Sequence, residues 1–144
     1  MVREKGKYSK IAHRAGQLFN SRITNEFWSS FKGEVGRIQA EVLVYLHDHN
    51  EGKISEMVEE LNVPKQHISK IVIEFIQNGL IQSKTSKEDK RSNILSLTPK
   101  GKSYMDRHFE LSDKYFNRLL DSMDENDQKE FIRALKTIDE ILSK

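Results

Sequence analysis

The chain has 144 residues, of which 32% are charged and 36% hydrophobic, and it contains no cysteine. This length suits one domain with its own core, and the missing cysteines exclude disulfides, thiolate metal ligands and cysteine redox switches. No apolar run approaches the ~20 residues needed to cross a bilayer, and residues 1–6 lack the apolar core of a signal peptide. We therefore expect a cytoplasmic protein without membrane contact.

The first predicted helix covers about residues 9–27, where apolar residues keep helical spacing. Its start is loaded with lysine and arginine, and positive charge there opposes the helix macrodipole. Two electrostatic partners would explain these cations, DNA phosphate or the acidic carboxy-terminal segment. A solvated and partly frayed terminus is the plainer interpretation.

A loop with large aromatic residues separates this helix from a second one, which ends near His49. A turn at 50–52 then leads to a third helix, for which Ser55 is a plausible N-cap. The third and fourth helices are short and amphipathic, and each needs the other to bury its apolar face. Those faces comprise Ile54, Met57, Val58 and Leu61 on one helix and Ile68, Ile71, Val72, Phe75 and Ile76 on the next.

Pro64 stands between these two helices, at what we expect to be a first helical position. The spacing is typical of a helix-turn-helix. Gly79 ends the fourth helix, because glycine accepts the left-handed conformation that follows a last turn.

Two short strands are expected at 80–85 and 93–97, joined by the charged, turn-forming segment 86–92. They form a hairpin with a basic tip. Thr98 and Pro99 supply an N-cap and a first-turn proline for the next helix. Residues 54–101 therefore predict a winged helix-turn-helix.

The helix after Thr98 continues to about residue 123, and its apolar surface is wider than one core-facing stripe requires. Such a helix is expected to be buried on two sides, by its own domain and by a partner. The last helix opens with acidic residues at 124–125, where the dipole favours them. Its apolar stripe is Phe131, Leu135, Ile138 and Leu142.

Polar residues on the outer face of the fourth helix have chemistry that suits base edges, since glutamine can pair with adenine and lysine with guanine or phosphate. They are Lys65, Gln66, His67, Ser69 and Lys70. A solvated helix face would have similar residues. The charge distribution favours DNA, because residues 64–102 hold eight lysines and arginines against three acidic residues in a chain of net charge +2.

Three pieces of the chain resemble the signature of the MarR (multiple antibiotic resistance regulator) family. They are the runs 75–81 (Phe-Ile-Gln-Asn-Gly-Leu-Ile), 89–91 (Asp-Lys-Arg) and 97–101 (Leu-Thr-Pro-Lys-Gly), in matching order and spacing. Phe75 departs from the family's usual leucine but stays apolar. The resemblance implies a mainly α fold with a small β-hairpin wing, that is, a winged helix-turn-helix plus N- and C-terminal dimerisation helices.

The resemblance also implies a function, a sequence-specific transcriptional regulator that binds double-stranded DNA as a homodimer, acting as a repressor. In the family an arginine of the wing enters the minor groove and an aspartate holds it, roles that fall on Arg91 and Asp89. Lys87 and Lys90 complete the basic wing tip.

We expect one domain over 1–144, with the DNA-binding lobe at 36–101 and dimerisation regions at 1–32 and 102–144. A two-fold dimer predicts an inverted-repeat operator.

A different class of function stays open, a winged helix that docks on an acidic protein partner instead of DNA. The sequence has no phosphate-binding glycine loop, metalloprotease histidine pair or nucleophile elbow, so we expect no enzyme and no cofactor. His47 and His49 are two residues apart, which suits one metal ion poorly on a helix.

Many members of the family bind small aromatic or anionic effectors, so the resemblance makes such an effector a further expected partner. Four aromatic residues are candidates to line its pocket, although each is more readily explained as core. They are Trp28, Phe31, Tyr45 and Tyr115.

Overall fold

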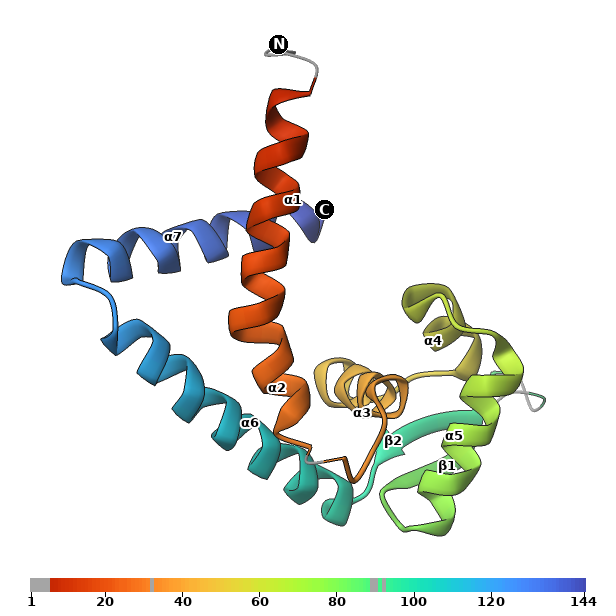
Figure 1. Ribbon diagram of the computed structural model, residues 1–144. Coiled ribbons are helices and arrows are strands. Elements are labelled where there is room, and N and C mark those ends of the chain that lie inside the picture. Colours follow the sequence, from red (N-terminus) through yellow and green to blue (C-terminus); the bar gives the residue numbers. More distant parts are fainter. Residues whose placement is uncertain (1–5, 32, 89–90, 92) are drawn as a thin grey trace.

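The computed structural model describes residues 6–31, 33–88, 91 and 93–144, and the predicted mainly α fold with a β-hairpin wing is confirmed. A long helical arm rises from one side of the molecule, and the winged-helix lobe lies on the other (Figure 1). The elements, in order, are α1 Lys7–Phe19, a π-helical turn Asn20–Thr24, α2 Asn25–Ser29, α3 Arg37–His49, α4 Ile54–Leu61, α5 Lys65–Gln77, β1 Ile81–Thr85, β2 Asn93–Leu97, α6 Pro99–Asp121 and α7 Glu125–Leu142.

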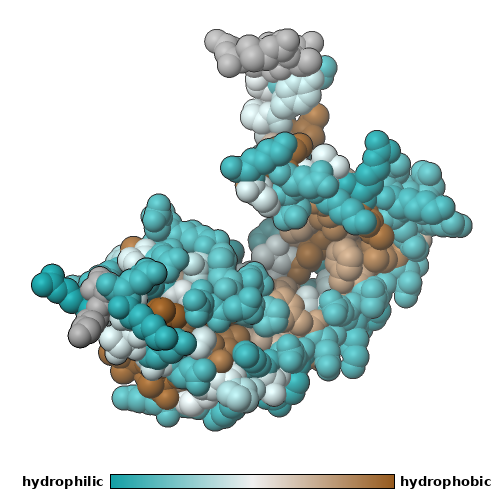
Figure 2. Space-filling model, turned by 180° about the vertical axis from the view of Figure 1, so that it is seen from behind, coloured by the Kyte–Doolittle hydropathy of each residue, from teal (hydrophilic) through white to brown (hydrophobic). Residues whose placement is uncertain are grey.

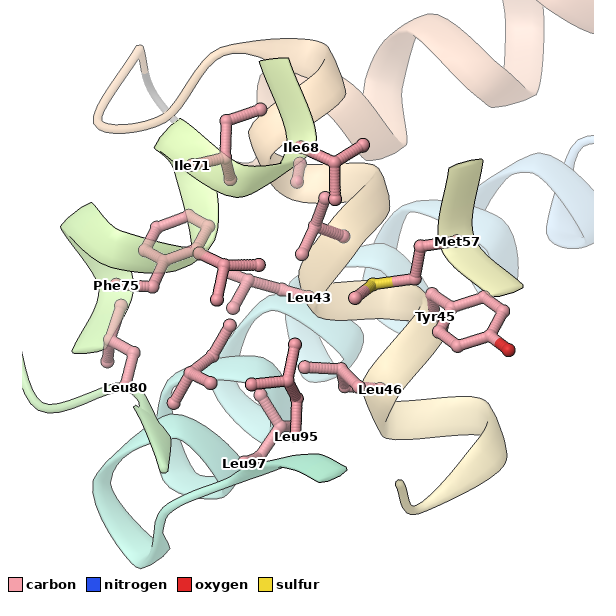
Figure 3. Close-up of a cluster of buried hydrophobic side chains, with 14 of the residues drawn as sticks. Leu43, Tyr45, Leu46, Met57, Ile68, Ile71, Phe75, Leu80, Leu95 and Leu97 are labelled. Carbon is pink, nitrogen blue, oxygen red and sulfur yellow. The ribbon is translucent and has the colours of Figure 1, made fainter. Parts of the chain in front are cut away.

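The hydrophobic core belongs almost entirely to the lobe. Side chains from α3, α4, α5 and both strands converge on one centre, where Leu43, Leu46 and Ile68 are each at most 1% exposed (Figure 3). The start of α6 adds Met105, which is fully buried. Helix α5 therefore packs one side against the core of the lobe and exposes the other side to solvent.

The hairpin is antiparallel, with Ile81 opposite Leu97 and Thr85 opposite Asn93. A third segment joins it at the far edge, because Gly52 exchanges two backbone hydrogen bonds with Leu95, of 2.8 and 2.9 Å. A side-chain Cβ at Gly52 would come within 2.6 Å of the Tyr45 ring. The expected turn at 50–52 therefore also extends the sheet, and the position needs a glycine.

One predicted helix start is confirmed, and two others differ from the prediction. Thr98 Oγ1 accepts a hydrogen bond from the Gly101 amide at 3.0 Å, as predicted. Asp124, predicted only as an acidic residue at the start of the last helix, is the N-cap of α7 and accepts the Asp127 N–H at 2.8 Å. Ser55 is not an N-cap, since α4 begins one residue earlier and the Glu56 carboxylate accepts the Lys53 N–H at 2.9 Å. Pro64 is the residue before α5 and not its first residue.

The predicted first helix at 9–27 is interrupted. Between α1 and α2 the chain makes a π-helical turn, which takes more residues per turn than an α-helix and shifts the side chains that follow. No residue of α1 or α7 is buried in the single chain.

Candidate nucleic-acid interface

Helix α5 separates its residues cleanly into two faces. Ile68, Ile71, Val72 and Phe75 are at most 3% exposed, and Figure 3 shows Ile68, Ile71 and Phe75 pointing into the core. The opposite face is open to solvent. Its predicted contact residues are the exposed Lys65, Gln66, His67 and Lys70 and the partly buried Ser69.

Two features set the position of α5. Asn62 ends α4 in a left-handed conformation, with φ 52° and ψ 48°, which turns the chain sharply before α5 begins. Further along, the Gln39 side chain of α3 donates a hydrogen bond to the Glu74 carboxylate of α5 at 3.3 Å. The amino-terminal end of α5, with Lys65 at its first position, is a favourable place for a phosphate because free N–H groups and the helix dipole both attract anions.

The wing gives a second polar surface. Lys87 and Arg91 are exposed on the segment between the strands, whereas Ser86, directly after β1, is 4% exposed. Asp89 and Lys90 lie outside the described residues. Strand β1 packs beside α5 and β2 pairs with β1, so the hairpin belongs to the same lobe as the polar face of the helix (Figure 1).

The aromatic residues considered for an effector pocket are largely structural. Phe31 is 1% exposed and stacks on His108 with ring centroids 4.1 Å apart, and Tyr45 is 6% exposed and stacks on His49 at 4.0 Å. Trp28 is half-buried, with the Arg37 guanidinium 5.4 Å from its ring centre. Tyr115 on α6 is also half-buried.

Two tyrosines are held in their neutral form. The hydroxyl of Tyr104 donates a 3.2 Å hydrogen bond to Glu34, and burial together with the Glu34 charge raises the Tyr104 pKa to about 12. Burial, and then the charges of Glu56 and Glu60, raise the pKa of Tyr45. Neither group lies on the polar face of α5.

The two histidines near the end of α3 point in different directions. His47 faces Asp106 at 3.9 Å, whereas His49 faces Glu60 at 3.6 Å and contacts the Tyr45 carbonyl oxygen at 2.9 Å. His47 also contacts Asp48 at 3.3 Å, so the two imidazoles face different carboxylates. Within the described part of the chain, no three histidine or acidic side chains gather closely enough to hold a metal ion.

Two residues of α5 differ from what the apolar pattern indicates. Ile76 was expected in the core but is 40% exposed, because no element covers that edge of the helix. Ile73, which the sequence reasoning did not single out, is 55% exposed. A helical wheel would have found it, since Ile73 lies seven residues after Gln66 and hence on nearly the same side.

A second uncovered surface lies away from the lobe. Apolar side chains of α1, the π-helical turn, α6 and α7 surround an open hollow, and Figure 2 shows apolar side chains gathered in the angle between these helices. Leu18 and Ile138 on its wall are 44% and 53% exposed. The hollow is lined by Ala15, Leu18, Phe19, Arg22, Ile23, Leu119, Met123, Phe131, Ala134, Leu135 and Ile138.

Among the described residues, no helix is both long and apolar enough to span a membrane.

Comparison with known proteins identifies the lobe. Residues 35–101 match the family model described as "Winged helix DNA-binding domain". No curated protein sequence matches the chain.

Solved structures match over nearly the whole chain, and the sequence identities are low. YusO from Bacillus subtilis is 20% identical, with a TM-score of 0.70 over 96% of this chain and 99% of its own. Wild-type MarR from E. coli is 14% identical, with a TM-score of 0.74 over 94% and 98%. FabT from Streptococcus pneumoniae, solved in complex with DNA, is 18% identical, with a TM-score of 0.72 over 95% and 98%.

The resemblance that the three sequence motifs indicate is thus confirmed in the fold. Residues 35–101 match a winged-helix family model, and the chain as a whole shares the fold of MarR and of the other solved structures named above.

Proposed function

We propose that this protein is a sequence-specific transcriptional repressor that binds an inverted-repeat operator as a homodimer. The observation that carries the proposal is the two-sided α5, with its buried apolar face and its exposed cationic and amide-bearing face, in a lobe of the DNA-binding winged-helix family. Lys65, Gln66 and Lys70 have the chemistry to contact phosphates and base edges in a major groove.

The wing is assigned to the adjacent minor groove. Arg91 suits the negative potential of a narrow groove, and Asp89 would hold its guanidinium through paired hydrogen bonds. Lys87 and Lys90 are assigned to the flanking phosphates. His67 and Ser69 complete the helix contacts.

Dimerisation is supported by the uncovered apolar surface of α1 and α7. Helices without a buried residue gain little from their own chain, and stable helices usually depend on packing an apolar face. We assign 1–32 and 102–144 to the dimer and 36–101 to DNA binding. Two α5 helices would then enter successive major grooves about 34 Å apart. A small aromatic or anionic effector that releases the DNA stays a prediction of the family resemblance.

Selection of bound duplexes from a random pool tests the proposal. We expect enrichment of an inverted repeat, with affinity falling steeply as salt rises, by about 0.9 log units per log unit of salt for each neutralised phosphate. Equal binding to all duplexes would contradict a sequence-specific regulator. It would favour the alternative, a winged helix that binds an acidic protein.

The wing assignment is tested on the selected operator. Arg91→Ala and Asp89→Ala are expected to weaken binding while leaving the thermal unfolding temperature unchanged, and Arg133→Ala, on the exposed side of α7, is the matched control. A large drop in unfolding temperature for Asp89→Ala would make that residue structural and the assigned role wrong.

A further inference from the structure

The polar face of α5 contains an exposed isoleucine. Ile73 is 55% exposed, and only Ile76 joins it as an exposed large apolar residue among the described residues of the lobe. Ile73 lies two helical turns after Gln66, so both side chains point to the same side of the helix. It shares a shallow hollow on that side with Lys65, Gln66, Ser69, Lys70 and Glu74.

An apolar side chain at this position calls for an apolar contact in an otherwise polar partner. The major groove offers one such group, the C5-methyl of thymine, which apolar side chains contact in direct readout. The hollow is flanked by Lys65 and Lys70, both exposed, and this positive charge fits a polyanion better than an apolar protein surface.

We infer that Ile73 is a specificity-determining residue that contacts a thymine methyl group in each operator half-site. This inference rests on the proposed function and deepens it. A rise of 1.5 Å per residue puts Ile73 about 10 Å along the helix from Gln66. The thymine is therefore expected up to about three base pairs from the base that Gln66 contacts, at 3.4 Å per step.

The experiment removes one methyl group at a time. Each thymine of the selected operator is replaced by deoxyuridine, which lacks the methyl and keeps every hydrogen-bonding group. We expect one thymine per half-site to matter, with an affinity loss of about fourfold for each methyl removed, the value for burying one such carbon.

The same duplexes are then measured with Ile73→Ala. This variant is expected to bind the thymine and deoxyuridine operators equally well, because the side chain that senses the methyl is gone. Ile76→Ala, one turn further along the same helix and 40% exposed, is the matched control and should keep the discrimination. Both variants replace exposed side chains, so their unfolding temperatures should match that of the parent protein.

The outcomes separate the inference from the proposed function. The role of Ile73 would be overturned if an operator is selected but none of its thymine methyl groups affects affinity. It would also be overturned if Ile73→Ala and the parent distinguish thymine from deoxyuridine equally well. Either result would leave the regulator proposal standing. An Ile73→Ala protein that binds all duplexes like the parent would point to another partner for the hollow, and would also overturn the inference. Failure to select any operator would contradict the proposed function itself.

Discussion

At the scale of single residues, the structure explains why the motif at 97–101 ends in a glycine, Gly101. A Cβ on this residue would lie 2.2 Å from the backbone oxygen of Leu80, an approach that no side-chain rotation can relieve. The same oxygen accepts the Thr98 N–H at 3.0 Å, so the start of α6 and the start of β1 are in direct backbone contact. Only glycine allows this approach.

Gly101→Ala should therefore lower the free energy of unfolding by about 1–3 kcal/mol, the usual cost of forcing an extra carbon into a packed site. Urea denaturation followed by circular dichroism measures the change. Lys102→Ala, the exposed neighbour in the same helical turn, is the control and should have little effect. Equal stability of the two variants would mean that α6 can shift away from β1 at no cost.

Tyr104 gives a prediction that depends on pH. Its pKa is raised to about 12, first by burial and then by the Glu34 charge and hydrogen bond, whereas an unfolded tyrosine ionises near 10. The folded state thus favours the neutral phenol. Its contribution to stability is complete below pH 10 and is lost as the pH rises from 10 to 12.

Absorbance of tyrosinate, followed during alkaline titration of the folded protein, measures this ionisation. Tyr104→Phe should remove the portion of the curve near pH 12. A late ionisation that persists in Tyr104→Phe would assign the high pKa to another tyrosine.

At the scale of elements, sequence patterns predicted what depends on local chemistry. The hairpin follows from two short strands and a charged turn, and the Thr98 cap follows from a side chain that satisfies a helix N–H group. The π-helical turn at 20–24 was missed, because a few apolar residues on either side of it fit a regular helix equally well.

Which residues of an element are exposed to solvent was harder to predict than where the element lies in the sequence. Ile76 lies at the edge of an apolar stripe, and only neighbouring elements decide whether an edge residue is covered. Gly52 was assigned to a turn because its pairing partner, Leu95, lies more than forty residues away in the chain. The assigned roles of the α5 and wing residues stay predictions until binding is measured.

The turn between α4 and α5 carries an element-scale prediction. Asn62 has a left-handed backbone, which costs most residues with a side chain about 1–2 kcal/mol and costs glycine nothing. Asn62→Ala should therefore unfold at a lower temperature than Asn62→Gly. Glu59→Ala, an exposed change inside α4, controls for the loss of a polar side chain. Identical unfolding of the alanine and glycine variants would show that the turn relaxes to another conformation.

At the scale of the whole molecule, the winged-helix lobe differs from helices α1 and α7 in how its apolar residues are buried. The lobe buries its apolar residues within one chain, whereas α1 and α7 bury none and face an open apolar hollow. The proposed homodimer resolves this difference, since a second copy would cover the hollow and set the distance between two α5 helices. Dimerisation and operator recognition should then fail together.

Ile138→Lys tests this link between the arms and DNA binding. Ile138 is 53% exposed on the wall of the hollow, and a charge buried there in the dimer would cost several kcal/mol, which weakens dimerisation more than a hundredfold. Analytical ultracentrifugation should find the parent as a dimer and Ile138→Lys as a monomer. Lys136→Glu, on the opposite side of α7, should remain a dimer.

The monomeric Ile138→Lys protein should also lose most of its affinity for the inverted repeat while keeping the weak affinity of one lobe for a half-site. A monomeric Ile138→Lys with full operator affinity would mean that a single copy is the DNA-binding unit.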